Sequence, residues 1–461
     1  MAAIATQFGE EMTMVRPVET IQTKRVAQFF FATFWTLVFT GSIRKWIFPG
    51  VSAFYLLQDV PITLAYLYAA FNGMFSRGYL FFITLLISAV VFLQAMLQLI
   101  ALGISPVIVV VGIHHYLYYL PMLLIFPLGL TPKYRRNFIR WNLWLTLPMG
   151  VLCVAQAMAP NTAWVNRTSE GDAMSLPGSD IARICGTYNF GVFFGIWLSL
   201  ALALCLGEWL LPYHQRVIRN RLLLPISTFT LVLIALASAS RQNILLCAAA
   251  ACGAFLAAAL IRSIRVIAVL AIFILSLPLI AGLTYIISPS EFNIVHDRFT
   301  GSAGQRDIKN RLGENVYGWL TEPEVSLIGK GVGLGVDAAH IGSVDAYNFT
   351  YELSELDSIR NVMELGTPVG LLYVALRYVL SIGMILLACR LVRASPHTLP
   401  IACVMFGQVL ADLTRAATMT ATQVMIGYSF ILGVYLYPYD EPEPALHESE
   451  PRTVLAAGTV A

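Results

Sequence analysis

The chain has 461 residues, of which 58% are hydrophobic and only 12% are charged. Charged residues make up about a quarter of an average soluble domain, so this composition excludes a soluble globular protein and indicates a polytopic membrane protein. The formal net charge of +3 gives no indication of nucleic-acid binding.

A membrane-spanning helix needs roughly 20 mainly apolar residues, and on this rule the chain divides into about twelve spans. Their expected limits are 26–42, 51–71, 79–101, 106–130, 141–159, 187–210, 222–239, 243–261, 266–287, 365–389, 399–414 and 418–438. The first and eleventh are short, which leaves re-entrant or interfacial segments open there. The expected fold is an all-α polytopic membrane protein with one large loop outside the membrane.

Basic residues fall on alternate loops between these spans, which indicates the orientation of the chain. They are Lys24, Arg25, Arg77, Lys133, Arg135, Arg136, Arg140, Arg216, Arg219, Arg221, Arg262, Arg265, Arg390 and Arg393. The positive-inside rule makes that side cytoplasmic, so both termini are expected inside the cell. Arg44 and Lys45 break the pattern and are expected outside, at the level of the lipid headgroups.

The same pattern divides the chain into five regions. They are a cytoplasmic tail at 1–25, nine spans at 26–287 with a small periplasmic loop at 160–180, a large periplasmic loop at 288–364, three spans at 365–438, and a tail at 439–461. The last tail is rich in acidic residues and proline, so we expect it to be disordered. The polar large loop, bracketed by apolar spans, is where chemistry is expected.

Seven cysteines lie within or beside apolar stretches, and none falls in the large loop. This distribution argues against a disulfide framework and against a zinc site. No cofactor is expected. The first 24 residues lack the short apolar core of a cleavable signal peptide. The first span is therefore expected to direct insertion.

Arginines at the outward ends of spans indicate an anion site. Arg183 precedes the sixth span, Arg241 lies in the turn before the eighth, and Arg415 lies in the turn before the twelfth. Each of them alone is explained equally well by snorkelling to lipid headgroups. Together with Arg311 and Arg360 in the large loop, they favour a site for a membrane-borne phosphate or diphosphate, which guanidinium groups bind in bidentate fashion.

The large loop contains a glycine run formed by Gly329, Gly331, Gly333 and Gly335. It is not a nucleotide-binding P-loop, because Lys330 lies between glycines and no serine or threonine follows it. A tight turn that lets two chain segments approach closely and a direct contact with a ligand both remain open.

The candidates for proton transfer in the loop are Glu355, Asp357 and His340. The alternative for each of them is a solvated surface residue without a catalytic role. Glu355, Asp357 and Glu364 lead directly into the tenth span, where partial desolvation favours a general base. Two further histidines, His114 and His115, lie within the fourth span, and we expect them to make interhelical hydrogen bonds. A position lining a pathway through the membrane is the alternative.

Taken in order, these segments resemble the O-antigen ligase and O-antigen polymerase family of bacterial inner-membrane proteins. The matching segments are Arg183 to Asn189, Ser238 to Arg241, Arg311 with Trp319, Pro323 and the glycine run, and Glu355 to Gly366 with Gly370. They cover roughly residues 180 to 375. The order of these segments and their placement against the spans carry the resemblance, since no single motif is specific.

The resemblance implies a fold like that of the C-type glycosyltransferases and a location in the bacterial inner membrane. It implies an undecaprenyl-diphosphate-linked saccharide as substrate, membrane lipid and polysaccharide assembly machinery as partners, no nucleic acid and no metal. Ligases of the family carry a histidine at the position that Glu355 occupies here. An O-antigen or exopolysaccharide polymerase is therefore favoured over a ligase, while His340 as a displaced histidine keeps the ligase open.

Two other classes of function remain open. A multi-pass secondary transporter or a flippase for lipid-linked glycans would use Asp59, Pro61 and Asp412 within the spans. The single large loop argues against it, because transporters usually show two repeated halves. A nonenzymatic assembly factor is the third reading, and it predicts that the loop arginines are dispensable.

Overall fold

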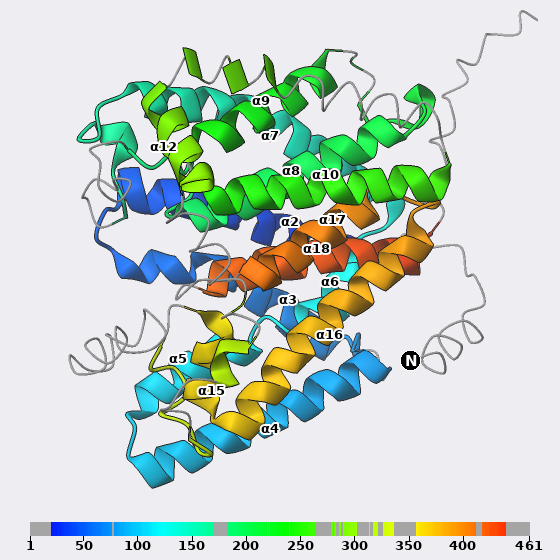
Figure 1. Cartoon of the computed structure of the whole chain (residues 1–461). Helices are drawn as coiled ribbons and strands as arrows, with labels where there is room; N and C mark the ends of the chain where they lie inside the picture. Colours follow the sequence, from blue (N-terminus) through cyan, green and yellow to red (C-terminus); the bar gives the residue numbers. More distant parts are fainter. Residues whose placement is uncertain are drawn as a thin grey trace, which may run out of the picture.

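The structure, a computed structural model, describes residues 20–75, 78–169, 182–218, 220, 222–238, 240–262, 278–279, 281–282, 285–286, 289–301, 313, 317–320, 326–335, 356–411 and 417–438. The secondary structure of these residues is helical, and they contain no strand. Figure 1 shows the helices stacked side by side, with α7 to α10 together on one side of the bundle and α4, α5, α15 and α16 on the other.

Seven of the described helices are long and apolar enough to cross a membrane. They are α2 (Ile21–Ser42, continued by a π-turn at Ile43–Ile47), α4 (Tyr79–Leu102), α7 (Pro132–Met158), α8 (Gly191–Leu210), α10 (Arg241–Ile261), α16 (Thr367–Leu391) and α18 (Ala417–Leu436). The bent pair α5 (Pro106–Leu117) and α6 (Met122–Gly129) makes up to one more span. This confirms a polytopic, all-helical membrane protein.

The remaining described helices are shorter. Three are apolar, namely α3 (Asp59–Phe71), α9 (Leu223–Ala237) and α17 (Thr398–Ala411). Others are α12 (Pro289–Thr300), α15 (Asp357–Leu365) and the 3-10 turns at Ser52–Gln58, Trp164–Asn166, Tyr213–Gln215 and Gly318–Leu320. Of these, α12, the turn at Gly318–Leu320 and α15 belong to the predicted large loop.

The described helices overlap the expected spans, although α3, α9 and α17 are shorter than a membrane span. There are two further differences and one gap. The expected span 106–130 is bent by 45° between α5 and α6, at a break that includes Pro121, which lacks the N–H needed to continue a helix. The fifth span begins at Pro132 and not near residue 141, because proline at the first helical position is pre-organised for a helix. The expected span 266–287 lies mostly outside the described residues.

Close contacts through glycines hold the centre of the bundle together. Helix α8 is buried at nearly every position and packs against α9, α10, α17 and α18. A Cβ atom at Gly253 of α10 would lie 2.7 Å from the Cα of Pro400 in α17, and one at Gly207 of α8 would meet the ring of His397. Small residues of this kind let helix backbones approach closely where lipid offers no hydrophobic drive for association.

One end of the bundle, here named the loop end, carries the turn after α2, the segment 182–190 and the N-termini of α8 and α10. Lys45 belongs to this end and is only 1% exposed. Its Nζ atom donates hydrogen bonds to the carbonyl oxygens of Gly186 at 2.7 Å and Tyr188 at 3.0 Å. The expected position of Lys45 among lipid headgroups is therefore wrong, because these carbonyls hold the ammonium group inside the protein.

The opposite end carries the loops that the sequence marks as basic. There the Nε2 atom of His397 lies 3.0 Å from Oε1 of Glu208, and both residues are buried. Arg135 donates to the carbonyl oxygen of Gly433 at 2.8 Å.

Candidate functional site

Helix α15 folds back against α16 in a tight hairpin at the loop end. Gly366 makes the turn with a φ angle of +80°, and a Cβ atom there would lie 2.3 Å from the carbonyl oxygen of Leu327. A Cβ atom at Gly370 would lie 2.5 Å from the Cα of Val362, so the two helices meet backbone to backbone. Only glycine fits either position, which explains why the motif that closes the loop contains both.

The hairpin holds the glycine run in place through Glu364, which is completely buried. The backbone N–H groups of Gly333 and Gly335 donate to its carboxyl oxygens at 2.8 and 2.9 Å, and the hydroxyl of Tyr116 donates at 3.0 Å. Burial raises the pKa of the Glu364 carboxyl, and the nearby Arg360 guanidinium and these donors oppose that rise only in part.

Helix α4 fixes the other side of the glycine run. The side chain of Gln98 accepts from the N–H of Val332 at 2.8 Å and donates to the carbonyl oxygen of Glu364 at 2.7 Å. Gly329, Gly331 and Gly333 have positive φ angles of 83°, 140° and 91°. These N–H groups and glycines serve contacts between chain segments, which is the first of the two roles that the sequence leaves open.

Asp357 is the centre of a buried charge cluster at the start of α15. Its carboxylate pairs with the guanidinium of Arg360 in α15 and with that of Arg377 in α16, and it accepts from the amide of Asn361 at 3.2 Å. Asp357 is 2% exposed and Arg360 is 1% exposed. Such buried charges need partners of opposite sign. Here the acidic side chains of Asp357 and Glu364 compensate the basic side chains of Arg360 and Arg377.

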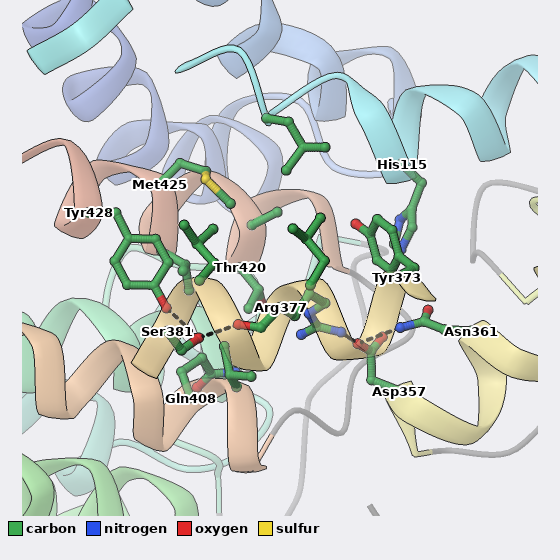
Figure 2. Close-up of a pocket in the computed structure, with 16 residues that line it drawn as sticks. His115, Asp357, Asn361, Tyr373, Arg377, Ser381, Gln408, Thr420, Met425 and Tyr428 are labelled. Atoms are coloured by element: carbon green, nitrogen blue, oxygen red, sulfur yellow. Dashed lines mark hydrogen bonds and ion pairs between the residues drawn. The ribbon is translucent and has the colours of Figure 1, made fainter. Parts of the chain in front are cut away.

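A cavity of about 70 Å³ lies beside this cluster, between α5, α15, α16, α17 and α18. Figure 2 shows Asp357, Asn361 and His115 at one end of it and Gln408, Ser381 and Tyr428 at the other, with Arg377 between them. The hydroxyl of Tyr428 donates to Oγ of Ser381 at 2.7 Å. The bundle therefore encloses a space that has polar groups at both ends and mainly apolar side chains between them.

Two predicted arginines lie at the N-termini of neighbouring helices. Arg241 is the first residue of α10, and the guanidinium of Arg183 lies against the first residue of α8, where a Cβ atom at Gly191 would be 3.1 Å from its Nε atom. The helices run parallel and touch where Asn243 meets Gly195. Two guanidinium groups and the N–H groups of two helix N-termini thus lie near one another, and both kinds of group attract anions.

Hydrogen bonds connect these N-termini to the cavity. Gln242, next to Arg241, donates to Oε1 of the cavity residue Gln408 at 2.9 Å. Gln423 of α18 donates to the carbonyl oxygen of Phe193 in α8 at 3.0 Å. The structure thus brings Arg183, Arg241 and the cavity to the same end of the bundle.

Four predicted site residues, Glu355, His340, Arg311 and Arg415, lie outside the described residues. Of the others, Asp357 and Arg360 lie in the charge cluster and the four glycines lie on its far side. Among the described residues no group of three or more His, Cys, Asp or Glu side chains is placed to hold a metal ion.

The sequence alone does not single out Arg377 and Gln408, whereas a lining role for His115 is one of its two alternatives. Arg377 carried a signal, because an arginine in the middle of an apolar span marks a functional or paired site. Gln408 carried none, since its partner Gln242 is 166 positions away in the chain. The expected interhelical bond is found at His114, whose Nε2 atom lies 3.1 Å from Oδ2 of Asp59.

No protein-family model matches this chain, and no curated protein matches it.

Proposed function

We propose that the protein is a membrane glycosyltransferase that polymerises or ligates a saccharide carried on undecaprenyl diphosphate, with O-antigen or exopolysaccharide polymerisation favoured. In this proposal the chain has about twelve spans in a bacterial inner membrane. Both termini are cytoplasmic, and residues 288–364 face the periplasm.

One observation carries the proposal most strongly, namely that a cationic surface and a polar cavity adjoin at the loop end. Arg183 and Arg241 lie at two parallel helix N-termini, and Gln242 bonds directly to Gln408 in the cavity wall. A lipid diphosphate approaching along the bundle meets the arginines, which places its saccharide beside the cavity.

The proposed reaction is a displacement at the anomeric carbon of the donor sugar. The hydroxyl oxygen of the acceptor forms a bond to that carbon, and the bond from the carbon to the phosphate oxygen breaks. The lipid diphosphate leaves with the electron pair, and Arg183 and Arg241 stabilise the charge that develops on it. The proton of the acceptor hydroxyl passes to a carboxylate, so no nucleotide is consumed.

The carboxylate that takes the proton is proposed to be Glu355. Asp357 already accepts from Arg360, Arg377 and Asn361, so its lone pairs are engaged and it serves to position these side chains. Glu355 lies two positions before it in the sequence and leads into the same helix. His340 is the alternative acceptor if the enzyme is a ligase.

The test is transfer by purified protein in vesicles that contain an undecaprenyl-diphosphate-linked saccharide, with products identified by mass spectrometry. Arg241→Ala and Arg311→Ala should abolish product, and Lys at either position should restore only part of it, because lysine lacks the bidentate fork. Arg393→Ala, which removes the same charge at the opposite end, is the control. Full transfer by both Arg241→Ala and Arg311→Ala would exclude the proposed donor site.

A transporter or flippase is the second candidate, and two observations favour it. The helix pair α5 and α6 is bent by 45°, and broken helices line many transport sites. Asp59 lies beside this break, where its carboxylate accepts from His114 and from the hydroxyl of Tyr119 at 2.9 Å. Flux of lipid-linked saccharide across the vesicle membrane that stops in Asp59→Asn, without any glycosidic bond formed, would select this function.

A further inference from the structure

Three polar atoms that line the cavity lack a hydrogen-bond partner. They are Nδ1 of His115, Nε2 of Gln408 and Oγ1 of Thr420. The three residues are 6%, 0% and 2% exposed, so bulk water does not satisfy them. Leaving a buried donor or acceptor without a partner is costly, and a cavity with several of them is a place where a ligand supplies the partners.

The other polar groups of the cavity are satisfied within the protein. Ser381 and Tyr428 bond to each other, and Asp357 pairs with Arg377. Gln408 is held through its oxygen by Gln242, which fixes the amide and leaves its nitrogen as the available donor. The unpartnered atoms are thus separate from the charge cluster.

The chemistry of the cavity indicates the class of ligand. Acidic and basic side chains compensate each other there, so the cavity favours a neutral group over a phosphate. Its volume of about 70 Å³ offers about five water-sized positions, enough for one sugar ring and too few for a longer oligosaccharide. Apolar side chains such as Leu376 and Met425 lie between the polar atoms. This suits a sugar ring, whose carbon-bound hydrogens contact apolar side chains while its hydroxyl groups form hydrogen bonds.

We infer that this cavity binds one neutral, hydroxyl-bearing sugar ring, with His115, Gln408 and Thr420 as its hydrogen-bond partners. This inference rests on the proposed function in one respect, since it makes that ring the acceptor. The acceptor hydroxyl then lies beside Gln408, and through Gln242 the cavity adjoins the arginines that hold the donor diphosphate.

Thermal unfolding of the full chain in lipid nanodiscs tests the inference, with methyl β-D-glucopyranoside and the methyl glycoside of N-acetylglucosamine as probes. Thr420→Val removes one unpartnered group at nearly constant volume, and Ala421→Leu fills the space. Thr146→Val is the matched control, because its buried hydroxyl bonds to Leu143 and Ser227 outside the cavity. Sugar at ten times its Kd should raise the wild-type Tm by about 1 to 2 °C.

The inference predicts that this rise is lost in Thr420→Val and Ala421→Leu and kept in Thr146→Val. It also predicts that Thr420→Val without sugar unfolds no earlier than wild type, since the lost hydroxyl had no partner, whereas Thr146→Val unfolds earlier. Equal rises in all variants would mean general stabilisation by sugar as a cosolute, and no rise in wild type would mean that the cavity holds water alone. Either result overturns the inference.

The same variants separate this inference from the proposed function. Transfer from the lipid-linked donor at the wild-type rate in Ala421→Leu would overturn the cavity as acceptor site and leave the glycosyltransferase standing. A cavity-dependent rise in Tm without transfer from any undecaprenyl-diphosphate donor would uphold the sugar site and reject the glycosyltransferase.

Discussion

Glu364→Gln is expected to release the glycine run from the α15–α16 hairpin. The substitution replaces one carboxyl oxygen by an NH₂ group, which cannot accept a hydrogen bond. The N–H of Gly333 or that of Gly335 then loses its acceptor and faces another donor. One buried unsatisfied donor costs about 1 to 3 kcal/mol. The free energy needed to open the glycine run locally should fall by that amount. The amide hydrogens of the run should therefore exchange about 5 to 150 times faster.

Hydrogen exchange followed by mass spectrometry on the peptide that covers Gly333 and Gly335 measures this effect. Glu208→Gln is the matched control, because Glu208 is equally buried, accepts from the N–H of Val217 at 2.8 Å, and lies at the opposite end. It should speed exchange near Val217 and leave the glycine run unchanged. Unchanged exchange of the glycine run in Glu364→Gln would refute the role assigned to this carboxyl.

The pH dependence of the same variant has a defined sign. The pKa of Glu364 is raised by burial, so the folded protein keeps this proton to a higher pH than the unfolded chain. Its contribution to stability is full below the ordinary pKa of 4.5 and is lost as the pH rises through the folded-state value. The stability difference between wild type and Glu364→Gln should therefore shrink as the pH is raised from about 5 to about 8. A difference that grows over this range would contradict the raised pKa.

Three further predictions concern the catalytic groups and the topology. Asp357→Asn leaves Arg360 facing a neutral partner and should cost about 3 to 5 kcal/mol of stability, seen as an earlier thermal transition; an unchanged transition would reject the buried ion pairs. Glu355→Gln should slow transfer by a factor of about 100 to 10,000 with donor binding retained, whereas inactive His340→Ala with active Glu355→Gln would select the displaced histidine. A reporter fused at Ser302 should read periplasmic and one at Asn220 cytoplasmic, and a cytoplasmic signal at Ser302 would overturn the topology.

The sequence predicts the positions of the helices well, because length and apolarity decide what spans a membrane. The sequence does not predict that Lys45, in the π-helix Ile43–Ile47, is buried. The carbonyl oxygens that hold its ammonium group belong to Gly186 and Tyr188, which are 141 and 143 positions away in the chain. Pro121 indicates a break between α5 and α6, but proline alone does not determine the angle of the bend.

The candidate site was predictable only where it is local in sequence. Asp357, Arg360 and Glu364 lie on consecutive turns of one helix, and the glycines next to them suggested a close approach of chain segments. The cavity is different, since it is built from α5, α15, α16, α17 and α18 together. Thr420 and Gln408 are ordinary polar residues in apolar spans, and only the packing of distant helices shows that their polar atoms lack partners.

Binding of undecaprenyl diphosphate tests the central claim most directly, because every donor of this class releases the same lipid diphosphate whatever sugar it carries. Native mass spectrometry of the protein in nanodiscs compares wild type with Arg241→Gln and with Arg393→Gln, which removes the same charge at the opposite end. The proposed donor site predicts affinity about 10 to 100 times weaker in Arg241→Gln, the effect of losing a hydrogen bond to a charged group, and unchanged affinity in Arg393→Gln. Equal affinities in all three proteins would contradict it.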